Sequence, residues 1–328
     1  MKTIFFGTQP YDRESFDRIN ADYGIRIKYH RSHLNIDNVP LAQGADAVCI
    51  FVNDSADAPT VGELARMGVR LIALRCAGFN NVDLKAAAEH GITVVRVPAY
   101  SPYAVAEHAV ALMLSLNRKV HRAYWRTRDG NFALLGFDMH GKTAGIVGTG
   151  KIARALIRIL RGFGMEVLGY DPCPDEAFAR ESGMTYVPLT ELYRRSDIIS
   201  LHCPLTDRTL HMIDAEAIGQ MKDGVIIINT GRGQLIRTSD LIEGLKEKKI
   251  GAAGLDVYEE EADYFYQDTS DRIMDDDMLA RLLSFNNVIL TSHQGFFTRE
   301  ALDNIARTTL ENIQAFSHGE CLNEVKYK

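Results

Sequence analysis

Short apolar runs alternate with helix-like segments throughout the first hundred residues. This alternation predicts βα units arranged around a parallel sheet. The stretch carries no phosphate-binding glycine loop, and we expect it to form a complete small domain. The five apolar runs span residues 3–6, 25–29, 47–52, 70–74 and 92–96.

A second alternation of apolar runs and helical patterns begins at Thr143. Six strands in this arrangement match the doubly wound sheet that binds dinucleotides. Between the two alternations, Ser101 and Pro102 are an N-cap and a proline at the first helical position, which predicts a helix through about Asn117. The six apolar runs span residues 144–148, 165–170, 197–202, 224–229, 251–257 and 288–291.

The composition and the net charge of the chain limit the kinds of molecule that the protein is expected to bind. A hydrophobic content of 46% and a charged content of 24% are ordinary for a soluble globular protein. The net charge of -6 argues against a nucleic-acid partner, because phosphate binding needs a basic face. Residues 118–128 form a basic segment within this acidic chain, and the segment also contains Tyr124 and Trp125. We interpret it as a solvated or subunit-contacting helix.

The five cysteines are dispersed, odd in number and without CxxC spacing. They are typical of reduced thiols in a cytoplasmic protein, and they indicate neither a disulfide framework nor a zinc site. The first apolar run is too short for the core of a signal peptide, and no run has the length of a membrane span. We therefore expect a cytoplasmic location and no membrane partner.

The segment from Gly148 to Ala153 has the pattern GxGxxA between a strand-like run and a helical pattern. Gly148 would make the tight turn, and Gly150 would let the backbone approach a pyrophosphate at the helix N-terminus. The pattern alone is a weak signal, because a glycine-rich turn that merely opens a helix has the same sequence. Asp171 strengthens it, since an acid ending the next strand accepts hydrogen bonds from the ribose hydroxyls and repels a 2′-phosphate. The expected cofactor is therefore NAD (NADH).

Three polar residues, Arg232, Glu261 and His293, each lie just beyond an apolar run. Ligands of open parallel sheets bind outside the carboxyl ends of strands, so these side chains are expected to converge beside the cofactor. Arg232 suits a 2-oxo acid's carboxylate, which its planar guanidinium holds through two hydrogen bonds. His293 would donate the proton in carbonyl reduction, and Glu261 would favour the charged imidazole. Metal-binding motifs such as HExxH are absent, and no metal is expected.

Each of these three residues also has a structural alternative. An arginine after a strand often caps a helix or pairs at the surface, and a lone histidine at a strand end is more often a structural residue. Glu261 belongs to an acidic run with Glu259 and Glu260, and two of the three are expected to be solvated. The shared strand-end location of Arg232 and His293 favours the catalytic interpretation.

An amphipathic segment from Thr298 to about Ser317 is expected to return to the first domain and make it discontinuous. At 328 residues the chain is long for a single core. The predicted fold class is α/β with two domains, a doubly wound Rossmann NAD-binding domain at 101–298 and a smaller flavodoxin-like parallel substrate domain. The substrate domain would comprise residues 1–100 plus 299–328.

Over essentially its whole length, the chain resembles the D-isomer-specific 2-hydroxyacid dehydrogenases. The matching motifs lie at residues 147–152, 229–233, 254–261 and 292–293. Within that family, the acidic and aromatic stretch 258–277, together with 293–297, looks like the fermentative NAD-dependent D-lactate dehydrogenases. The family pattern places the catalytic glutamate five residues after the aspartate of the GLDV-type motif, which selects Glu261 from Asp256.

The resemblance also implies contacts that the residues alone do not. Asp256 would reach the nicotinamide carboxamide, and the backbone amides of Ala77 and Gly78 would bind the substrate carboxylate beside Arg232 and His293. Tyr100 and Phe296 would line a small substrate pocket. The further implied NAD contacts are Lys151, Ile152, Asp171, Cys203, Pro204, Thr209, Thr230, Gly231 and Arg232.

The implied activity is reversible reduction of pyruvate to D-lactate with NADH. Two alternatives stay open. One is a D-2-hydroxyacid dehydrogenase for a larger 2-oxo acid, and the other is a non-catalytic NAD-sensing regulatory protein. The family further implies a homodimer or higher homo-oligomer, with a contact supplied by the helix from Ser101 and the basic aromatic segment after it.

Overall fold

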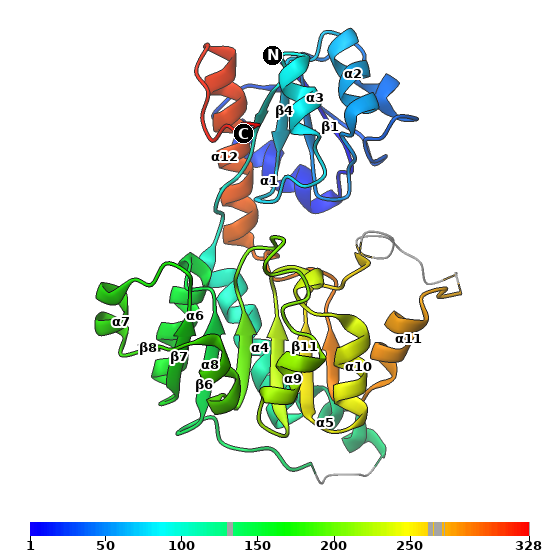
Figure 1. The fold of residues 1–328 in the computed structure, drawn as a ribbon. Coiled ribbons are helices and arrows are strands. Elements are labelled where there is room, and N and C mark those ends of the chain that lie inside the picture. The colour runs from blue at the N-terminus through cyan, green and yellow to red at the C-terminus, as the bar shows by residue number, and fades with distance from the viewer. Residues whose placement is uncertain (130–133, 262–264, 266–270, 272, 328) are drawn as a thin grey trace. The chain divides into compact units, whose positions relative to one another are not determined.

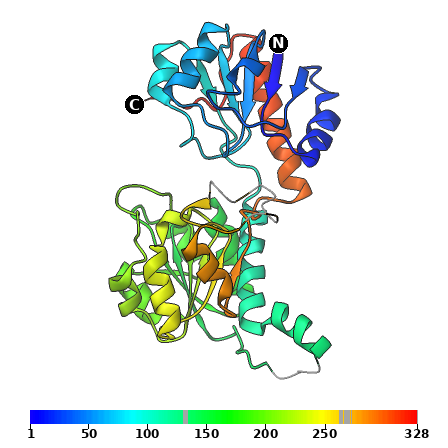
Figure 2. The same cartoon turned by 90° about the vertical axis from the view of Figure 1, so that its right-hand side faces the viewer.

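The computed structural model describes residues 1–129, 134–261, 265, 271 and 273–327. The chain divides into two compact units, shown in Figures 1 and 2. Unit 1 comprises Met1–Ser101 and Phe296–Lys328, and unit 2 comprises Pro102–Gly295. Unit 1 is therefore built from two separate stretches of sequence.

Unit 1 contains a five-stranded parallel sheet with the strand order β2-β1-β3-β4-β5. This is the flavodoxin-like order. Its central strands are buried on both faces because helices cover each side, as the continuous apolar runs predict. The elements are β1 (Lys2–Phe5), α1 (Pro10–Asn20), β2 (Arg26–Tyr29), η1 (Val39–Ala42), β3 (Ala47–Ile50), α2 (Ala58–Arg66), β4 (Leu71–Leu74), α3 (Leu84–Glu89), β5 (Thr93–Val95) and α12 (Arg299–Ser317).

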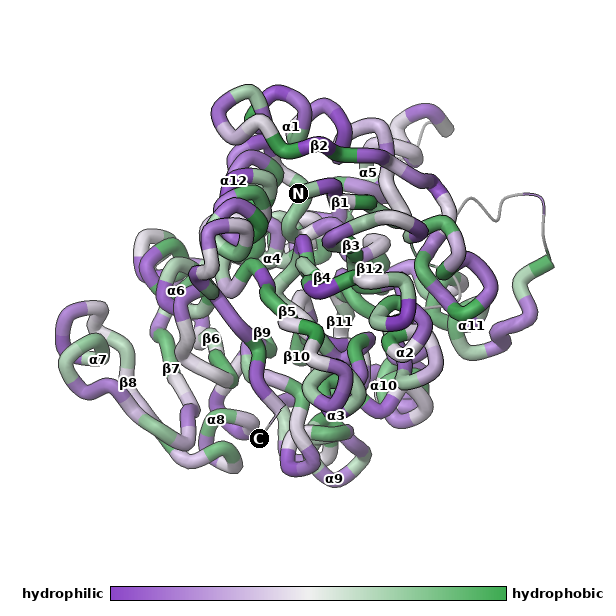
Figure 3. The backbone as a smooth tube through the Cα atoms, turned by 90° about the horizontal axis from the view of Figure 1, so that it is seen from above, coloured by the Kyte–Doolittle hydropathy of each residue, from purple (hydrophilic) through white to green (hydrophobic). Residues whose placement is uncertain are grey.

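The last helix, α12, completes unit 1 by packing against α1 and β4. It begins after Thr298, whose side-chain hydroxyl accepts a hydrogen bond from the Ala301 N–H and caps the first turn. Hydrophobic and hydrophilic residues alternate along this helix in Figure 3, as expected for a helix with one buried face. Beyond it, the Val325 N–H donates to the Val94 carbonyl and holds the chain end against β5.

Unit 2 contains a seven-stranded parallel sheet with the order β12-β11-β10-β9-β6-β7-β8. Six of these strands were expected, and β8 was missed because two residues are too short to show a periodic pattern. The elements are α4 (Pro102–Arg118), α5 (Val120–Arg126), η2 (Thr127–Asp129), β6 (Thr143–Val147), α6 (Lys151–Gly162), β7 (Glu166–Tyr170), α7 (Glu176–Ser182), β8 (Thr185–Tyr186), α8 (Leu189–Arg195), β9 (Ile198–Leu201), α9 (Ala215–Gln220), β10 (Val225–Asn229), η3 (Gly233–Leu235), α10 (Thr238–Lys246), β11 (Ile250–Leu255), α11 (Asp277–Ser284) and β12 (Val288–Leu290).

The order of this sheet is the doubly wound one, in which the chain direction across the sheet reverses between β6 and β9. Dinucleotides bind at the carboxyl ends of the strands on either side of such a reversal. One apolar core joins α4 and α6 to one face of the sheet, and a second joins α8, α9 and α10 to the other. The fold class predicted from the sequence is confirmed in both units.

Among the described residues, no helix combines the length and apolar character needed to cross a membrane.

Candidate active site

Gly148 and Gly150 lie in the loop after β6, at the carboxyl ends of the strands where the strand order reverses. Each of them is required for a different reason. Gly148 has a φ of +86°, and a Cβ placed on it would lie 2.6 Å from the Cys203 backbone nitrogen. A side chain there would therefore separate the loops that follow β6 and β9. Gly150 has an ordinary φ of -69°, and a Cβ on it would meet no atom within 4 Å. Its lack of a side chain leaves open space above the N-terminus of α6.

The N-terminus of α6 has no side-chain cap. Its first N–H groups therefore need a partner from outside the helix, and the positive end of the helix dipole favours an anion. Lys151 and Ile152 form the first turn, and Ala153 is buried against the sheet where helix and strand pack closely. This geometry fits the pyrophosphate of a dinucleotide.

Asp171 lies directly after β7, beside the glycine loop. One carboxylate oxygen accepts hydrogen bonds from the Thr149 N–H at 2.8 Å and the Thr149 hydroxyl at 3.1 Å, and the other accepts from the Cys173 N–H at 2.9 Å. Burial raises the pKa of Asp171, but these hydrogen bonds and the charge of Arg154 outweigh it and hold the pKa below its usual value. The residue therefore carries a negative charge at the place where an adenosine ribose is expected.

The loop after β9 lies across from the glycine loop that follows β6. It begins with the half-buried Cys203, whose backbone lies close to Gly148. Pro204 follows it, and its carbonyl accepts a hydrogen bond from the Thr209 hydroxyl at 2.7 Å. The predicted contacts Cys203, Pro204 and Thr209 thus belong to one closed loop.

Arg232 is positioned by a turn that the buried Asn229 side chain closes. The Asn229 amide donates to the Arg232 carbonyl at 2.8 Å, and its side-chain oxygen accepts from the Gly231 N–H at 3.0 Å. A Cβ on Gly233 would lie 2.0 Å from the Tyr258 carbonyl oxygen, so this turn rests directly on the loop after β11. Thr230, in the same turn, is buried.

His293 and Glu261 form a contact pair in unit 2. The Nδ1 atom of His293 lies 3.0 Å from a carboxylate oxygen of Glu261, and both side chains are about one-fifth exposed, at 17% and 24%. The other Glu261 oxygen accepts from the Tyr258 N–H at 3.1 Å. The structure thus brings together two residues that are 32 positions apart, and it rules out a solvated Glu261.

The backbone of His293 is in the left-handed region, with a φ of +52°. Its N–H lies 2.7 Å from the Asp256 carbonyl and 2.8 Å from the Thr291 carbonyl. Left-handed backbone is uncommon in residues other than glycine, although histidine tolerates it better than most, and its cost must be offset by the surrounding structure. The loop that carries His293 is therefore constrained by its neighbours.

Asp256 accepts many of the hydrogen bonds that hold the loop around His293 in place. The sequence pattern did not predict this role for Asp256. Its side chain is 1% exposed, and its carboxylate accepts from the Gln294 N–H and the Gly295 N–H, each at 2.7 Å. The Thr291 hydroxyl donates to the same carboxylate at 2.6 Å. The residue predicted to contact nicotinamide thus has both carboxylate oxygens hydrogen-bonded to the loop around His293.

Glu259 corrects the expectation that two of the three glutamates in the acidic run are solvated. Only Glu260 is exposed. Glu259 accepts hydrogen bonds from the N–H and hydroxyl of Thr238, at 3.1 and 2.7 Å, and pairs with the His211 ring. It therefore ties the loop after β11 to the start of α10. The run of three glutamates does not predict these contacts of Glu259, because Thr238 and His211 lie 21 and 48 positions away in the sequence.

The residues with predicted substrate contacts in unit 1 occupy two places. Ala77 and Gly78 lie in the loop between β4 and α3, where the Arg96 guanidinium donates to the Ala77 carbonyl at 2.8 Å. Tyr100 and Phe296 contact each other with ring centroids 6.3 Å apart. Phe51, which no sequence motif indicates, adds a third ring, whose centroid lies 5.8 Å from that of Phe296. Only the tertiary structure places the Phe51 ring beside Phe296.

Comparison with known proteins identifies the family. The family model described as "D-isomer specific 2-hydroxyacid dehydrogenase, NAD binding domain" matches residues 110–295. The chain belongs to the D-isomer-specific 2-hydroxyacid dehydrogenase family. This confirms the family predicted from the motifs, and it shows that NAD is the cofactor of the matched domain.

Individual members of the family resemble the chain over nearly its full length. A D-lactate dehydrogenase of Escherichia coli is 51% identical over 329 residues, covering 99% of this chain and 100% of the relative. The apo-structure of the Escherichia coli enzyme superposes with a TM-score of 0.91 at 50% identity, covering 99% and 100% of the two chains. A structure reported for the pyruvate reductase of Chlamydomonas reinhardtii superposes with a TM-score of 0.92 at 43% identity, covering 98% of each chain.

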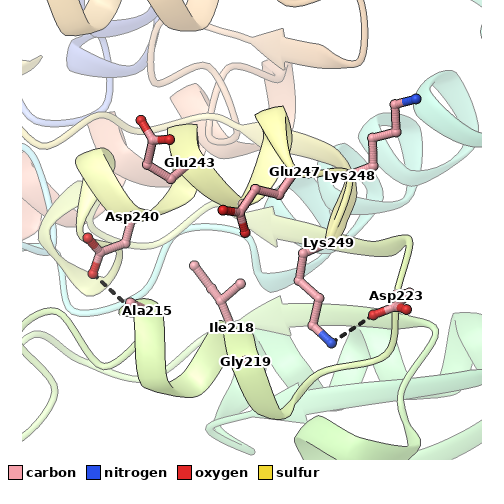
Figure 4. Close-up of a pocket in the computed structure, with 10 residues that line it drawn as sticks. Ala215, Ile218, Gly219, Asp223, Asp240, Glu243, Glu247, Lys248 and Lys249 are labelled. Atoms are coloured by element: carbon pink, nitrogen blue, oxygen red, sulfur yellow. Dashed lines mark hydrogen bonds and ion pairs between the residues drawn. The ribbon is translucent and has the colours of Figure 1, made fainter.

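Outside this family site, a surface hollow of about 660 Å³ lies between α9 and α10 (Figure 4). Asp223 and Lys249 form an ion pair there, and they lie two residues before β10 and one residue before β11, so the hollow is at the amino ends of these strands. Acidic side chains dominate its lining, and these repel the anionic groups of NAD and of a 2-oxo acid. The hollow is therefore distinct from the site described above.

The structure describes only part of the acidic and aromatic stretch 258–277, which resembles the D-lactate dehydrogenases of the family. Its residues 262–264, 266–270 and 272 lie outside the described residues. Among its described residues, Phe265 is buried in the core on the α9 and α10 side of the sheet.

Proposed function

We propose that this protein is an NAD-dependent D-lactate dehydrogenase that reduces pyruvate to D-lactate and catalyses the reverse oxidation. The observation that carries the proposal is the contact between His293 and Glu261, located with the Arg232 turn at the carboxyl ends of the strands in unit 2. The 51% identity to a relative named D-lactate dehydrogenase supports the choice of substrate.

The residues at the crevice fit NAD. The uncapped α6 N-terminus and the open space above Gly150 would hold the pyrophosphate, and the charged Asp171 would accept hydrogen bonds from the ribose. The loops that contain Cys203 and Thr230 would border the rest of the cofactor. When bound, NADH supplies the hydride that reduces the carbonyl carbon.

Arg232 would hold the substrate carboxylate with its guanidinium, which orients the carbonyl for reduction. His293 would donate a proton from Nε2 to the carbonyl oxygen as negative charge develops there, because Nδ1 is the atom that faces Glu261. Glu261 would stabilise the imidazolium before transfer and fix the ring orientation. In the oxidation direction, neutral His293 would remove the hydroxyl proton.

In unit 1, the backbone amides of Ala77 and Gly78 are proposed to bind the substrate carboxylate. The rings of Tyr100, Phe296 and Phe51 are proposed to limit the size of the substrate side chain, because aromatic rings in contact leave little room for a larger group. These three rings favour pyruvate over a larger 2-oxo acid.

We also propose that the protein is a cytoplasmic homodimer or higher homo-oligomer. Its five cysteines are free thiols, which suits a reducing compartment. On α5, Val120, Tyr124 and Trp125 are 55%, 58% and 68% exposed, and large exposed apolar side chains that gather on one short helix are typical of a subunit contact. Light scattering on the parent and on Trp125→Glu would test this, and a monomeric parent would contradict it.

The function is tested by following NADH oxidation with pyruvate, 2-oxobutyrate, 2-oxoisocaproate, phenylpyruvate and glyoxylate, with chiral analysis of the pyruvate product. Fastest turnover of pyruvate to D-lactate supports the proposal. Preference for a larger 2-oxo acid would keep the mechanism and change the substrate. Absence of turnover on all five, with NADH still bound, would favour the NAD-sensing alternative.

Two variants test the assigned roles in the same assay. His293→Gln should lower kcat roughly 100- to 10,000-fold, the usual contribution of a general acid. Arg232→Lys should raise KM for pyruvate and lower kcat together, because lysine lacks the planar fork. Glu260→Gln is the matched control, since Glu260 is exposed in the same acidic run. Parental turnover by His293→Gln would contradict the proton-donor role.

A further inference from the structure

His108 lies on α4, the helix that packs against β10, β11 and β12 in unit 2. Its side chain is 23% exposed. Its Nε2 atom lies 3.0 Å from the Thr291 hydroxyl oxygen and 3.2 Å from a carboxylate oxygen of Asp256. Both partners belong to the hydrogen-bonded group that holds the His293 loop, and neither lies near His108 in sequence.

The hydrogen bonds around Thr291 determine which atom carries the hydrogen. The Thr291 hydroxyl has one hydrogen, and its 2.6 Å contact with Asp256 requires that it donate to the carboxylate. Toward His108 the hydroxyl oxygen is therefore an acceptor. We assign the hydrogen of His108 to Nε2, which then donates to both Thr291 and Asp256.

This donation matters because Asp256 is a buried carboxylate. Burial raises the pKa of Asp256, but the hydrogen bonds that it accepts from His108, from Thr291 and from the Gly295 N–H lower the pKa below its usual value. A buried carboxylate needs several donors to stay ionised. Of the four described residues that donate to the Asp256 carboxylate, His108 is the one that lies outside the loops after β11 and β12, so it anchors this hydrogen-bonded group to helix α4.

The ionised Asp256 in turn fixes the two residues that follow His293. The N–H groups of Gln294 and Gly295 donate to opposite oxygens of the carboxylate, each at 2.7 Å. His293 itself is in the left-handed region at a φ of +52°, a conformation that depends on such restraints. Loss of one restraint should let the imidazole move away from Glu261.

We propose that His108 is a positioning residue for the reaction, which holds the His293 loop in place through Asp256 and Thr291. The inference rests on the proposed function, because it assumes that His293 donates the proton. His108 does not need to touch the substrate or the cofactor for this role.

The first experiment compares His108→Phe with His108→Gln. Phenylalanine keeps the ring volume and removes the donor, whereas glutamine can place an N–H near the original Nε2 position. We expect kcat for pyruvate to fall roughly 10- to 100-fold in His108→Phe, the cost of an ångström-scale misplacement of a catalytic group. His108→Gln should recover most of this loss. The control is His318→Phe, because His318 is exposed after α12 in unit 1.

A second readout does not depend on turnover. In His108→Phe, amide hydrogen exchange at Gln294 and Gly295 should accelerate roughly 10- to 100-fold, which corresponds to the loss of one hydrogen bond to a charged group. Exchange in the strands of unit 1 should not change. His108→Gln should return both amides toward parental rates. This measurement tests the role of His108 even if pyruvate is the wrong substrate.

A double-variant cycle tests whether His108 acts through Thr291. Thr291→Val removes the hydroxyl, and the His108→Phe/Thr291→Val pair should lose less activity than the product of the single losses. Multiplicative losses would overturn the shared network. Parental kcat and parental amide exchange in His108→Phe would overturn the proposal itself. An inactive parent whose amide exchange still responds to His108→Phe would count against the function and support the positioning role.

Discussion

Separate replacement of Gly148 and Gly150 by alanine should distinguish two roles of the glycine loop. We expect Gly148 to be needed for folding stability and Gly150 to be needed for NADH binding. At Gly148 the φ of +86° costs an alanine about 1–2 kcal/mol. The new Cβ would also lie 2.6 to 2.8 Å from three backbone atoms of His202 and Cys203, and such overpacking costs about 1–3 kcal/mol. Gly148→Ala should therefore lower the free energy of unfolding of unit 2 by about 2 to 5 kcal/mol.

Gly150→Ala is the matched comparison. Its φ of -69° suits alanine and its Cβ would meet no protein atom within 4 Å. The only expected cost to folding is the poorer N-cap, below about 1 kcal/mol. The Cβ would instead occupy the space proposed for the pyrophosphate, so the Kd for NADH should rise about tenfold or more, equivalent to about 1.4 kcal/mol.

The assay is urea unfolding followed by circular dichroism, together with NADH binding followed by its fluorescence. Gly148→Ala should unfold at lower urea without cofactor, whereas Gly150→Ala should lose most of the stabilisation that NADH adds to the parent. Parental NADH affinity in Gly150→Ala would refute the placement of the pyrophosphate. Parental stability in Gly148→Ala would refute the close contact between the loops after β6 and β9.

Two further predictions concern titratable side chains in the loops after β7 and β9. Asp171→Ser should raise the ratio of NADPH to NADH activity, because it removes the carboxylate that repels a 2′-phosphate; an unchanged ratio would assign cofactor choice to another residue. Burial lowers the pKa of His202 to about 4 from 6.5. The unfolded chain then binds this proton more tightly than the folded one, so stability should fall as pH drops from 6.5 toward 4. Urea midpoints in His202→Gln should show a weaker fall, and identical pH profiles would contradict the assignment.

The sequence predicted the features that depend on local pattern. Among the described strands, the central ones were located by continuous apolar runs, because strands buried on both faces need apolar residues at every position. The edge strand β2 was located although it alternates charged and apolar residues, and β8 was missed because it is only two residues long. The glycine loop and the acid after β7 were found from their spacing along one βα unit, which the chain geometry makes nearly constant. The family resemblance selected Glu261 from three adjacent glutamates, and its contact with His293 agrees with that choice.

Tertiary structure alone decided which distant polar groups become partners. The capping role of Glu259, the third ring supplied by Phe51 and the connection from His108 to Asp256 join residues 21 to 245 positions apart. A polar residue shows no periodicity that identifies its partner, since a hydrogen bond depends on where the folded backbone places two atoms. The left-handed backbone of His293 has the same origin. Its sequence neighbours do not require it, and the buried carboxylate of Asp256 holds it.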